Sequence, residues 1–166
     1  DEEKYASGRP TLESTVTAIM SPSGFIKSTS DAEGPYGFFM DATTFYAESG
    51  GQVCDSGLIT TPSGSMSVSD VKVAAAYVMH TGDVSGTVSV GDAAKCAVDY
   101  DRRDNIMPNH TMTHVLNYAL RKVMGDGVDQ KGSLVDEEKL RFDFSHNKGA
   151  TTKQIAEIEA IVNEQI

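Results

Sequence analysis

The sequence is poor in cysteine, in long apolar runs and in basic side chains, and each shortage excludes a class of protein. Its 166 residues include only two cysteines, Cys54 and Cys96, which are not at CxxC spacing. We expect reduced thiols, with a disulfide or a metal ligand as the alternative. The longest apolar runs, such as VKVAAAYVM, are too short to span a membrane, and the N-terminus has no basic start followed by an apolar stretch. We therefore expect no signal peptide and a cytoplasmic protein.

The scarcity of basic residues argues against a general nucleic-acid binder. The chain carries 14 Lys and Arg against 24 Asp and Glu, a net charge of -10. The imbalance is uneven, because residues 1–100 hold 5 basic and 13 acidic side chains, whereas residues 101–166 hold 9 and 11. A surface that contacts a polyanion is therefore expected in the second part of the chain.

Residues 1–100 have the pattern of a small β-barrel or sandwich. Short runs rich in Val, Thr, Phe and Tyr are separated by Gly, Ser, Pro and Asp about every ten residues. These runs are STVTAIM, YGFFMDATTFYA, GLITT, SMSVSDVKVA, AAYVMHTG, GTVSV and AAKCAVDY.

From residue 101 onward the pattern becomes mixed helix and strand. Apolar residues recur at helical spacing from His110 to Met124, with Asn109 as the expected N-cap and Gly125 as the stop. The run LRFDFSH predicts a strand, and Thr151 or Thr152 is expected to cap a second helix. We expect that helix to run to the last residue, which makes the chain look truncated.

The string NHTMTH holds the first candidate site. His110 and His114 are four residues apart on the expected helix, so both imidazoles project from one face. This spacing lets two nitrogens reach one metal ion, as in helical zinc sites. Two surface or core histidines are the plain alternative.

A second candidate is the glycine-rich string ESGGQ. Gly50 and Gly51 predict a loop with an unusual backbone, and Gln52 can present an amide to a ligand. We expect the loop to join two antiparallel strands of the barrel and to approach the helix that bears His110. A tight turn without chemistry is the alternative.

The third candidate is a set of polar and basic side chains in the second part of the chain. Gln130 has an amide that can orient a substrate or water, although a solvated loop is the default for QKGS. The candidates for contacts with phosphate are Arg102, Arg103, Lys131 and Arg141.

Three strings, taken together and in order, resemble alanyl-tRNA synthetases. They are DATTFYAESGGQVCDSG, NHTMTHVLNYALRKVMG and DQKGSLVDEEKLRFDFSH, and the resemblance covers Thr11 to Ile166. It is closer to the eukaryotic cytosolic enzymes. The resemblance implies an α+β protein: a β-barrel like those of translation factors at residues 1–100, then the first part of an editing core at residues 101–166.

The resemblance also implies a proofreading reaction. A site for alanine discriminates weakly against glycine and serine, because one small group is worth only about 1–3 kcal/mol in a pocket. A second site therefore hydrolyses seryl- or glycyl-tRNA(Ala), and its partner is the acceptor end of that tRNA. In the family, the residues that correspond to Thr113 and Gln130 handle the wrong amino acid, and the SGGQ loop influences editing.

Zinc is the implied cofactor. The pair His110 and His114 matches the family's HxxxH ligands, whereas its other two ligands come from a CxxxH motif that this sequence does not contain. The metal would either position the tRNA terminus or activate water. ATP and magnesium would serve the aminoacylation domain of such a synthetase, no element of which occurs in these residues.

Three alternatives remain open from the sequence. They are a free-standing editing factor, a barrel that binds tRNA without catalysis, and the editing region of a threonyl-tRNA synthetase, which shares the HxxxH core. For these 166 residues alone we expect weak hydrolysis or none.

Overall fold

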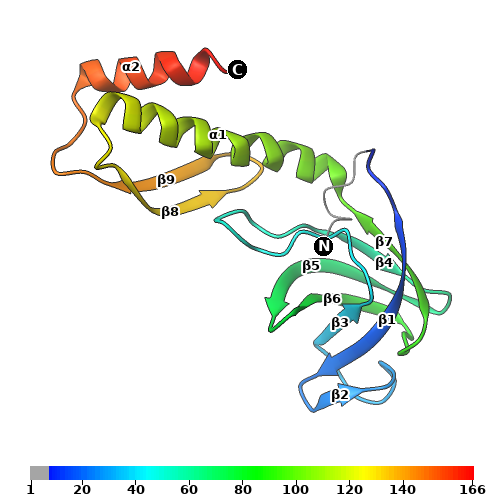
Figure 1. The fold of residues 1–166 in the computed structure, drawn as a ribbon. Helices are drawn as coiled ribbons and strands as arrows, with labels where there is room; N and C mark the ends of the chain where they lie inside the picture. The colour runs from blue at the N-terminus through cyan, green and yellow to red at the C-terminus, as the bar shows by residue number, and fades with distance from the viewer. Residues whose placement is uncertain (1–7) are drawn as a thin grey trace. The chain divides into compact units, whose positions relative to one another are not determined.

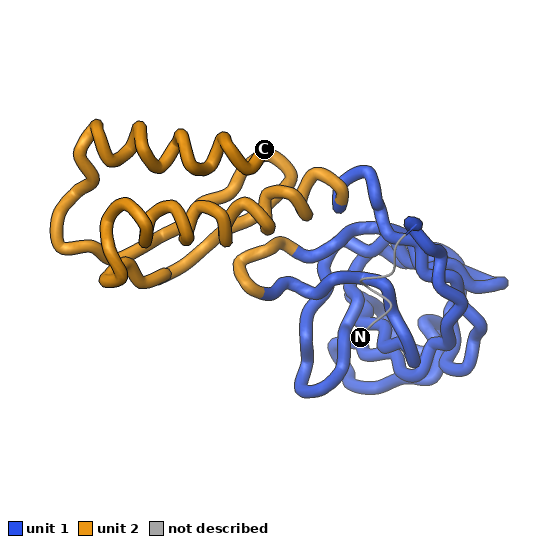
Figure 2. Tube along the Cα trace, turned by 45° about the horizontal axis from the view of Figure 1, so that its top comes forward, with its two compact units in different colours: residues 1–49, 54–103 blue, residues 50–53, 104–166 orange. Residues whose placement is uncertain are grey.

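The computed structural model describes residues 8–166, which form two compact units. The first unit contains residues up to Ser49 together with Cys54–Arg103, and the second contains Gly50–Val53 and Asp104–Ile166 (Figure 2). The α+β class expected from the sequence is confirmed. Within the described part of the chain, neither helix is long and apolar enough to cross a membrane.

The first unit is a closed barrel of six antiparallel strands (Figure 1). Strand β1 pairs with β3 on one side and with β7 on the other, which closes the order β1-β3-β6-β5-β4-β7, and β2 adds to β1 outside this ring. The strands are β1 (Leu12–Ser21), β2 (Gly24–Ile26), β3 (Tyr36–Met40), β4 (Gly57–Thr60), β5 (Gly64–Ala74), β6 (Tyr77–Gly86) and β7 (Ala93–Val98).

Two β-bulges adjust the inward-facing positions of the longest strands. The register shifts between Val16 and Ala18 in β1 and between Val68 and Asp70 in β5. Each bulge lets two core residues that are three positions apart both face inward, since an unbroken strand would alternate strictly. The core so formed includes Val16, Ile19, Phe38, Phe45, Ile59, Met66, Val68, Val71 and Cys96.

Two strand predictions in the barrel were wrong in detail, and one strand was not predicted. The run YGFFMDATTFYA is a strand only as far as Met40, because the Asp41 carboxylate accepts hydrogen bonds from Ser14 Oγ and the amide of Ala42 and turns the chain. GTVSV is not a strand of its own, since β6 continues to Gly86 and Ser89 makes only an isolated bridge. The short strand β2 was missed.

The second unit contains most of α1 (Tyr100–Met124), the hairpin of β8 (Asp129–Val135) and β9 (Leu140–Ser145), and α2 (Thr152–Asn163). Helix α1 runs alongside both α2 and the hairpin (Figure 1). The common core of these elements consists of Ala119, Leu120, Val128 and Ile158. Phe142 and Phe144 of β9 pack against it.

Helix α1 begins at Tyr100, nine residues before the expected cap at Asn109. The Asp99 carboxylate accepts the amide of Arg102 at 3.1 Å and so caps the first turn. Pro108 lies inside the helix, where it removes one helical hydrogen bond without ending the helix. The Asn109 side chain instead donates to the carbonyl of Asp136 at 2.9 Å. Gly125, with φ +97, follows the last helical residue as expected.

The remaining predictions for the second unit had mixed outcomes. Strand β9 and the cap of α2 are confirmed, since Thr151 and Gln154 form a capping box. Gln130 and Lys131 lie in strand β8 rather than in a loop. Helix α2 ends at Asn163, so the expectation that it reaches Ile166 was wrong.

Candidate functional site

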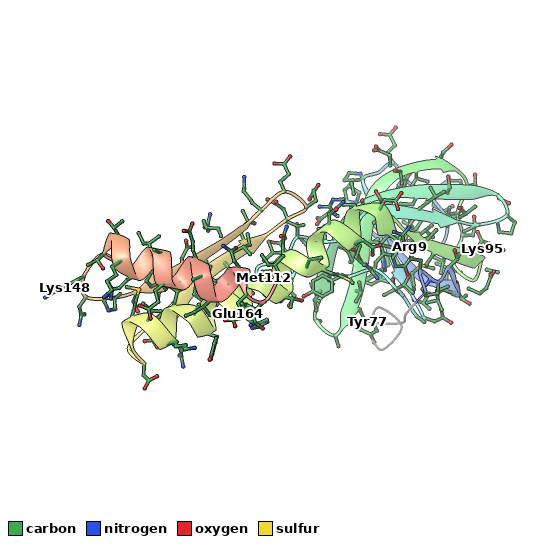
Figure 3. All side chains as sticks on the ribbon, turned by 90° about the horizontal axis from the view of Figure 1, so that it is seen from above. Arg9, Tyr77, Lys95, Met112, Lys148 and Glu164 are labelled. Carbon is green, nitrogen blue, oxygen red and sulfur yellow. The ribbon has the colours of Figure 1, made fainter. Side chains whose placement is uncertain are left out.

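The two histidines of NHTMTH lie on one helix, as predicted. They are one turn apart in the middle of α1, on either side of Met112, which Figure 3 labels. The rings of His110 and His114 stack with their centroids 5.7 Å apart and their planes at 24°. Two imidazoles on one tetrahedral zinc would have centroids about 5 Å apart, given metal–nitrogen bonds of about 2 Å. The centroid separation is thus close to this value, but the rings would have to turn out of their stacked arrangement for both nitrogens to face one metal ion.

The glycine-rich loop pairs with strand β8 inside the second unit. The amide of Val53 donates to the carbonyl of Val135 at 3.0 Å, and the amide of Val135 donates to the carbonyl of Gly51 at 2.7 Å. The Ser133 hydroxyl adds a hydrogen bond to the carbonyl of Gly50 at 3.1 Å. Gln52 thereby forms a parallel bridge with Val135, so the loop acts as a short extra strand beside the hairpin.

The loop joins two barrel strands of opposite direction, as expected. It connects β3 to β4, which are not neighbours in the barrel, through an irregular segment that carries no strand from Asp41 to Ser56. Because β5 and β6 lie between β3 and β4, the connection cannot be a hairpin.

Gly51 is required by the close approach of β8. Its φ is +84, and a Cβ atom there would lie 2.1 Å from Ser133 Oγ and 2.7 Å from the Ser133 carbonyl oxygen. Gly50 also has a positive φ, +62, yet a Cβ atom would be at an ordinary 3.7 Å from the His110 ring. The second glycine of the motif is thus constrained by packing as well as by conformation.

Gln52 directly contacts the first histidine. Its side chain is buried, and its Oε1 lies 2.6 Å from Nδ1 of His110. Since an amide oxygen only accepts, Nδ1 must be the donor, and the lone pair of the neutral ring then resides on Nε2. The loop therefore selects the tautomer of His110 whose Nε2 can bind a metal ion or accept a proton.

The hydroxyl of Thr113 is engaged within the helix. Thr113 is buried, and its Oγ1 donates to the carbonyl of His110 at 2.6 Å. The resemblance implies that Thr113 handles the wrong amino acid, but its hydroxyl proton is already used in this hydrogen bond. Thr113 can offer a substrate the lone pairs of its oxygen and its methyl group.

Gln130 and two of the basic candidates lie on the hairpin. Gln130 is exposed in β8, opposite Phe144 of β9, and the register slips between Gln130 and Gly132. Lys131 and Arg141 are both exposed, and each has a carboxylate near it: Lys131 Nζ lies 3.9 Å from Asp129, and Arg141 forms a bidentate pair with Asp143. Both cations remain accessible to phosphate.

Arg103 is not available for phosphate, which corrects the expectation from its sequence position. Its side chain is only 5% exposed, and its guanidinium binds the buried carboxylate of Asp55 and the carbonyl of Thr44. Arg102 donates from Nη1 to the carbonyl of Cys54 at 2.7 Å. Both arginines thus fasten the segment around the glycine-rich loop within the first unit.

Comparison with known proteins now identifies the chain. A family model described as "tRNA synthetases class II (A)" matches residues 2–102. The chain belongs to this family.

Relatives of this class II tRNA synthetase chain are alanine–tRNA ligases. It is 49% identical to the alanine–tRNA ligase of Candida albicans over all of its length and 40% identical to the cytoplasmic alanine–tRNA ligase of Dictyostelium discoideum over 93% of it. It is also 50% identical to the alanine–tRNA ligase of a Janthinobacterium species over 76% of its length. The resemblance to alanyl-tRNA synthetases is therefore confirmed. The chain spans 15–17% of the length of these relatives.

Two features of the histidines of this synthetase chain suit a role as zinc ligands. They are four residues apart on one helix, and the hydrogen bond from Nδ1 of His110 to Gln52 resembles the contact that zinc-bound histidines usually make. Within residues 8–166, no group of three His, Cys, Asp or Glu side chains converges. The described part of the chain thus offers two candidate ligands, whereas zinc sites use three or four protein ligands.

Sequence reasoning missed the residues that hold the loop. Ser133 and Val135 pair with Gly50–Val53, but their strand was interpreted as a loop. The run SLV begins at Ser133, the last residue of QKGS. A strand prediction for this run would have indicated the pairing.

Proposed function

We propose that this chain is the part of an alanine–tRNA ligase that supports hydrolysis of seryl- or glycyl-tRNA(Ala). The observation that carries the proposal is the hydrogen bond between Gln52 and His110. It joins two motifs that lie 58 residues apart in the chain.

The tautomer of His110 determines which of its nitrogens can take part in hydrolysis. With Nδ1 donating to Gln52, Nε2 of His110 is left as a base or ligand, and the ring of His114 lies beside it. Zinc bound there would supply a Lewis acid that polarises the ester carbonyl or lowers the pKa of water. Gln52 itself orients the imidazole of His110 and selects its tautomer.

We assign substrate recognition to four further residues of the second unit. Thr113 would contact the side chain of the wrong amino acid, and Gln130 would present its amide from the hairpin. Lys131 and Arg141, which are both 61% exposed, would meet phosphates of the acceptor end. The partner is therefore the acceptor end of tRNA(Ala), and we propose a cytoplasmic location, where charged tRNA is used.

The experiment compares Gln52 variants in an alanine–tRNA ligase that carries these 166 residues. We expect Gln52→Leu to slow hydrolysis of seryl-tRNA(Ala) by about 10- to 100-fold, as for other residues that orient metal-bound histidines. Gln52→Glu keeps an acceptor for Nδ1 and should retain most of the rate. Gln165→Leu, the same substitution at an exposed position, is the matched control.

Two results would reject the proposal. One is a ligase that does not hydrolyse seryl-tRNA(Ala) while it still aminoacylates, which would leave a segment that only binds tRNA. The other is full hydrolysis by a His110→Ala variant, which would place the reaction elsewhere.

A further inference from the structure

Helix α1 has an exposed face that carries an aromatic side chain one turn beyond the second histidine. Ala119 and Leu120 are buried in the core of the second unit, where Ile158 of α2 joins them. At 3.6 residues per turn, His114 and Tyr118 point to the opposite side of the helix. His114 is exposed, and Tyr118 is 59% exposed. Tyr118 is therefore a large aromatic ring on the accessible face that also presents His114.

The same face is basic, although the chain as a whole is strongly acidic. Arg121 and Lys122 lie in the last turn of α1, and both are exposed. The stretch from Asn105 to Met124 contains no Asp or Glu, whereas the whole chain has 24. Lys122 Nζ lies 5.7 Å from the centroid of the Tyr118 ring, which is within the range of a cation–π contact. The face thus suits a ligand that combines negative charge with an aromatic group.

The spacing of these side chains matches the parts of one nucleotide. His114, Tyr118 and Lys122 follow one another at steps of four residues, so each lies about 6 Å further along the helix axis. In a charged tRNA the amino acid is esterified to the terminal ribose, which also carries the adenine base and the 5′-phosphate. An ester at the histidines therefore brings the base within reach of Tyr118 and the phosphate within reach of the two basic side chains.

We propose that Tyr118 stacks on the base of the terminal nucleotide of charged tRNA, and that Arg121 and Lys122 bind the adjoining phosphates. This inference rests on the proposed function. The acceptor end is single-stranded, and unpaired bases stack on exposed aromatic side chains while basic side chains follow the backbone. The ammonium of Lys122 lies over one side of the Tyr118 ring, and the base occupies the other. Tyr118 thereby positions the ester against the histidines.

The test is a double-mutant cycle in an alanine–tRNA ligase that carries these residues. One substrate is seryl-tRNA(Ala), and the other is the same tRNA acylated chemically on a terminal ribose that lacks its base. We expect Tyr118→Ala to raise KM for hydrolysis of the first substrate about tenfold with unchanged kcat, as for the loss of one stacked base. KM for the second substrate should not change. Tyr118→Phe keeps the ring and should retain the parent KM.

Two further variants complete the design. Tyr77→Ala removes another exposed tyrosine, 67% exposed in the barrel, and should leave both kinetic constants unchanged. Arg121→Gln should raise KM for both substrates and lower the slope of log KM against log salt concentration by about one, as expected for the loss of one phosphate contact.

The remaining outcomes overturn the inference. An unchanged KM for the normal substrate in Tyr118→Ala would show that the ring does not contact the base. An equal rise for both substrates would show that Tyr118 acts on the helix rather than on the base. A parent-like salt dependence in Arg121→Gln would remove the phosphate contact. The proposed function fails in a different way, because the parent ligase would then hydrolyse neither substrate, or His110→Ala would hydrolyse both at the full rate.

Discussion

His80 lies in the barrel interior with no exposed surface, opposite Phe38 of the neighbouring strand. Its Nδ1 contacts the carbonyl of Phe38 at 3.1 Å and its Nε2 contacts the hydroxyl of Thr43 at 2.8 Å. Burial lowers the pKa of His80 from 6.5 to about 4. The folded barrel therefore holds this ring neutral at pH values where the unfolded chain would protonate it.

This histidine should weaken the barrel in mild acid. Because its folded pKa is depressed, its contribution is complete above pH 6.5 and is lost as the pH falls toward 4. We expect about 2–3 kcal/mol less free energy of unfolding at pH 4.5 than at pH 7.5 from this group. Urea unfolding of the parent chain and of His80→Gln at both pH values checks this.

The same experiment has an internal control. The pKa of Asp41 lies below its usual 3.8, chiefly because Ser14 and the amide of Thr15 donate to it, so its effect begins only below pH 3.8. The interval from 6.5 to 4.5 therefore lies above the range in which Asp41 acts, and His80→Gln reports the share that belongs to His80. An equally steep loss of stability in His80→Gln would contradict the assignment.

The two glycines of the loop should respond differently to a methyl group. Gly50→Ala should lower the free energy of unfolding by about 1–2 kcal/mol, because alanine disfavours a positive φ. Gly51→Ala has the same conformational cost, and its Cβ atom would also clash with Ser133. We expect Gly51→Ala to unpair the loop from β8 and Gly50→Ala to leave it paired. Hydrogen exchange at the amides of Val53 and Val135, which bond across this junction, measures the difference. Equal protection in both variants would show that the contact with Ser133 does not constrain Gly51.

At the scale of elements, one buried ion pair secures the irregular segment between β3 and β4. Asp55 is 1% exposed and Arg103 is 5% exposed, and the carboxylate also accepts the amide of Tyr46 at 2.6 Å. The guanidinium of Arg103 additionally lies 5.0 Å from the ring of Tyr100. Arg103 in the first turn of α1 thus binds residues on both sides of the glycine-rich loop, Thr44 before it and Asp55 after it.

Breaking this pair should be costly. In Asp55→Asn the buried guanidinium loses its counter-charge, so we expect a loss of about 3–5 kcal/mol in the free energy of unfolding. The control is the surface ion pair between Glu13 and Lys95, of which Lys95 is labelled in Figure 3. Both side chains are more than half exposed, so Glu13→Gln should lower the free energy of unfolding by less than about 1 kcal/mol. Chemical denaturation of both variants measures the two changes in the free energy of unfolding. Similar changes would mean that burial does not make the Asp55–Arg103 pair stronger than the surface pair.

At the scale of the whole chain, the ligand count limits what residues 1–166 can do alone. Two histidines give zinc fewer protein ligands than either structural or catalytic sites use. We expect the isolated chain to retain little zinc through gel filtration and to hydrolyse seryl-tRNA(Ala) weakly or not at all. The net charge of -10 should further oppose tRNA, most strongly at low salt.

Zinc content and hydrolysis measured together on the same protein check this expectation. An alanine–tRNA ligase that carries these residues and a CxxxH motif serves as the comparison, and it should both retain zinc and hydrolyse the ester. Stoichiometric zinc in the isolated chain, lost in His114→Ala, would show that two histidines suffice.

The sequence alone determined the class of the fold and the pairing of the histidines. Alternation with a period of two and helical spacing are local properties, so they predicted a β-rich first part, strand β9 and the capped helix α2. The four-residue spacing of His110 and His114 likewise placed both rings on one helical face before any contact was known.

Only the tertiary structure decided which distant groups meet. Gln52 and His110, Gly51 and Ser133, and Asp55 and Arg103 are separated by 48 to 82 residues, and no local pattern encodes such contacts. The burial of Arg103 and the strand that contains Gln130 depend on the same long-range packing. Propensity describes what a segment can form by itself, whereas burial and hydrogen-bond partners are set by the rest of the chain that folds around it.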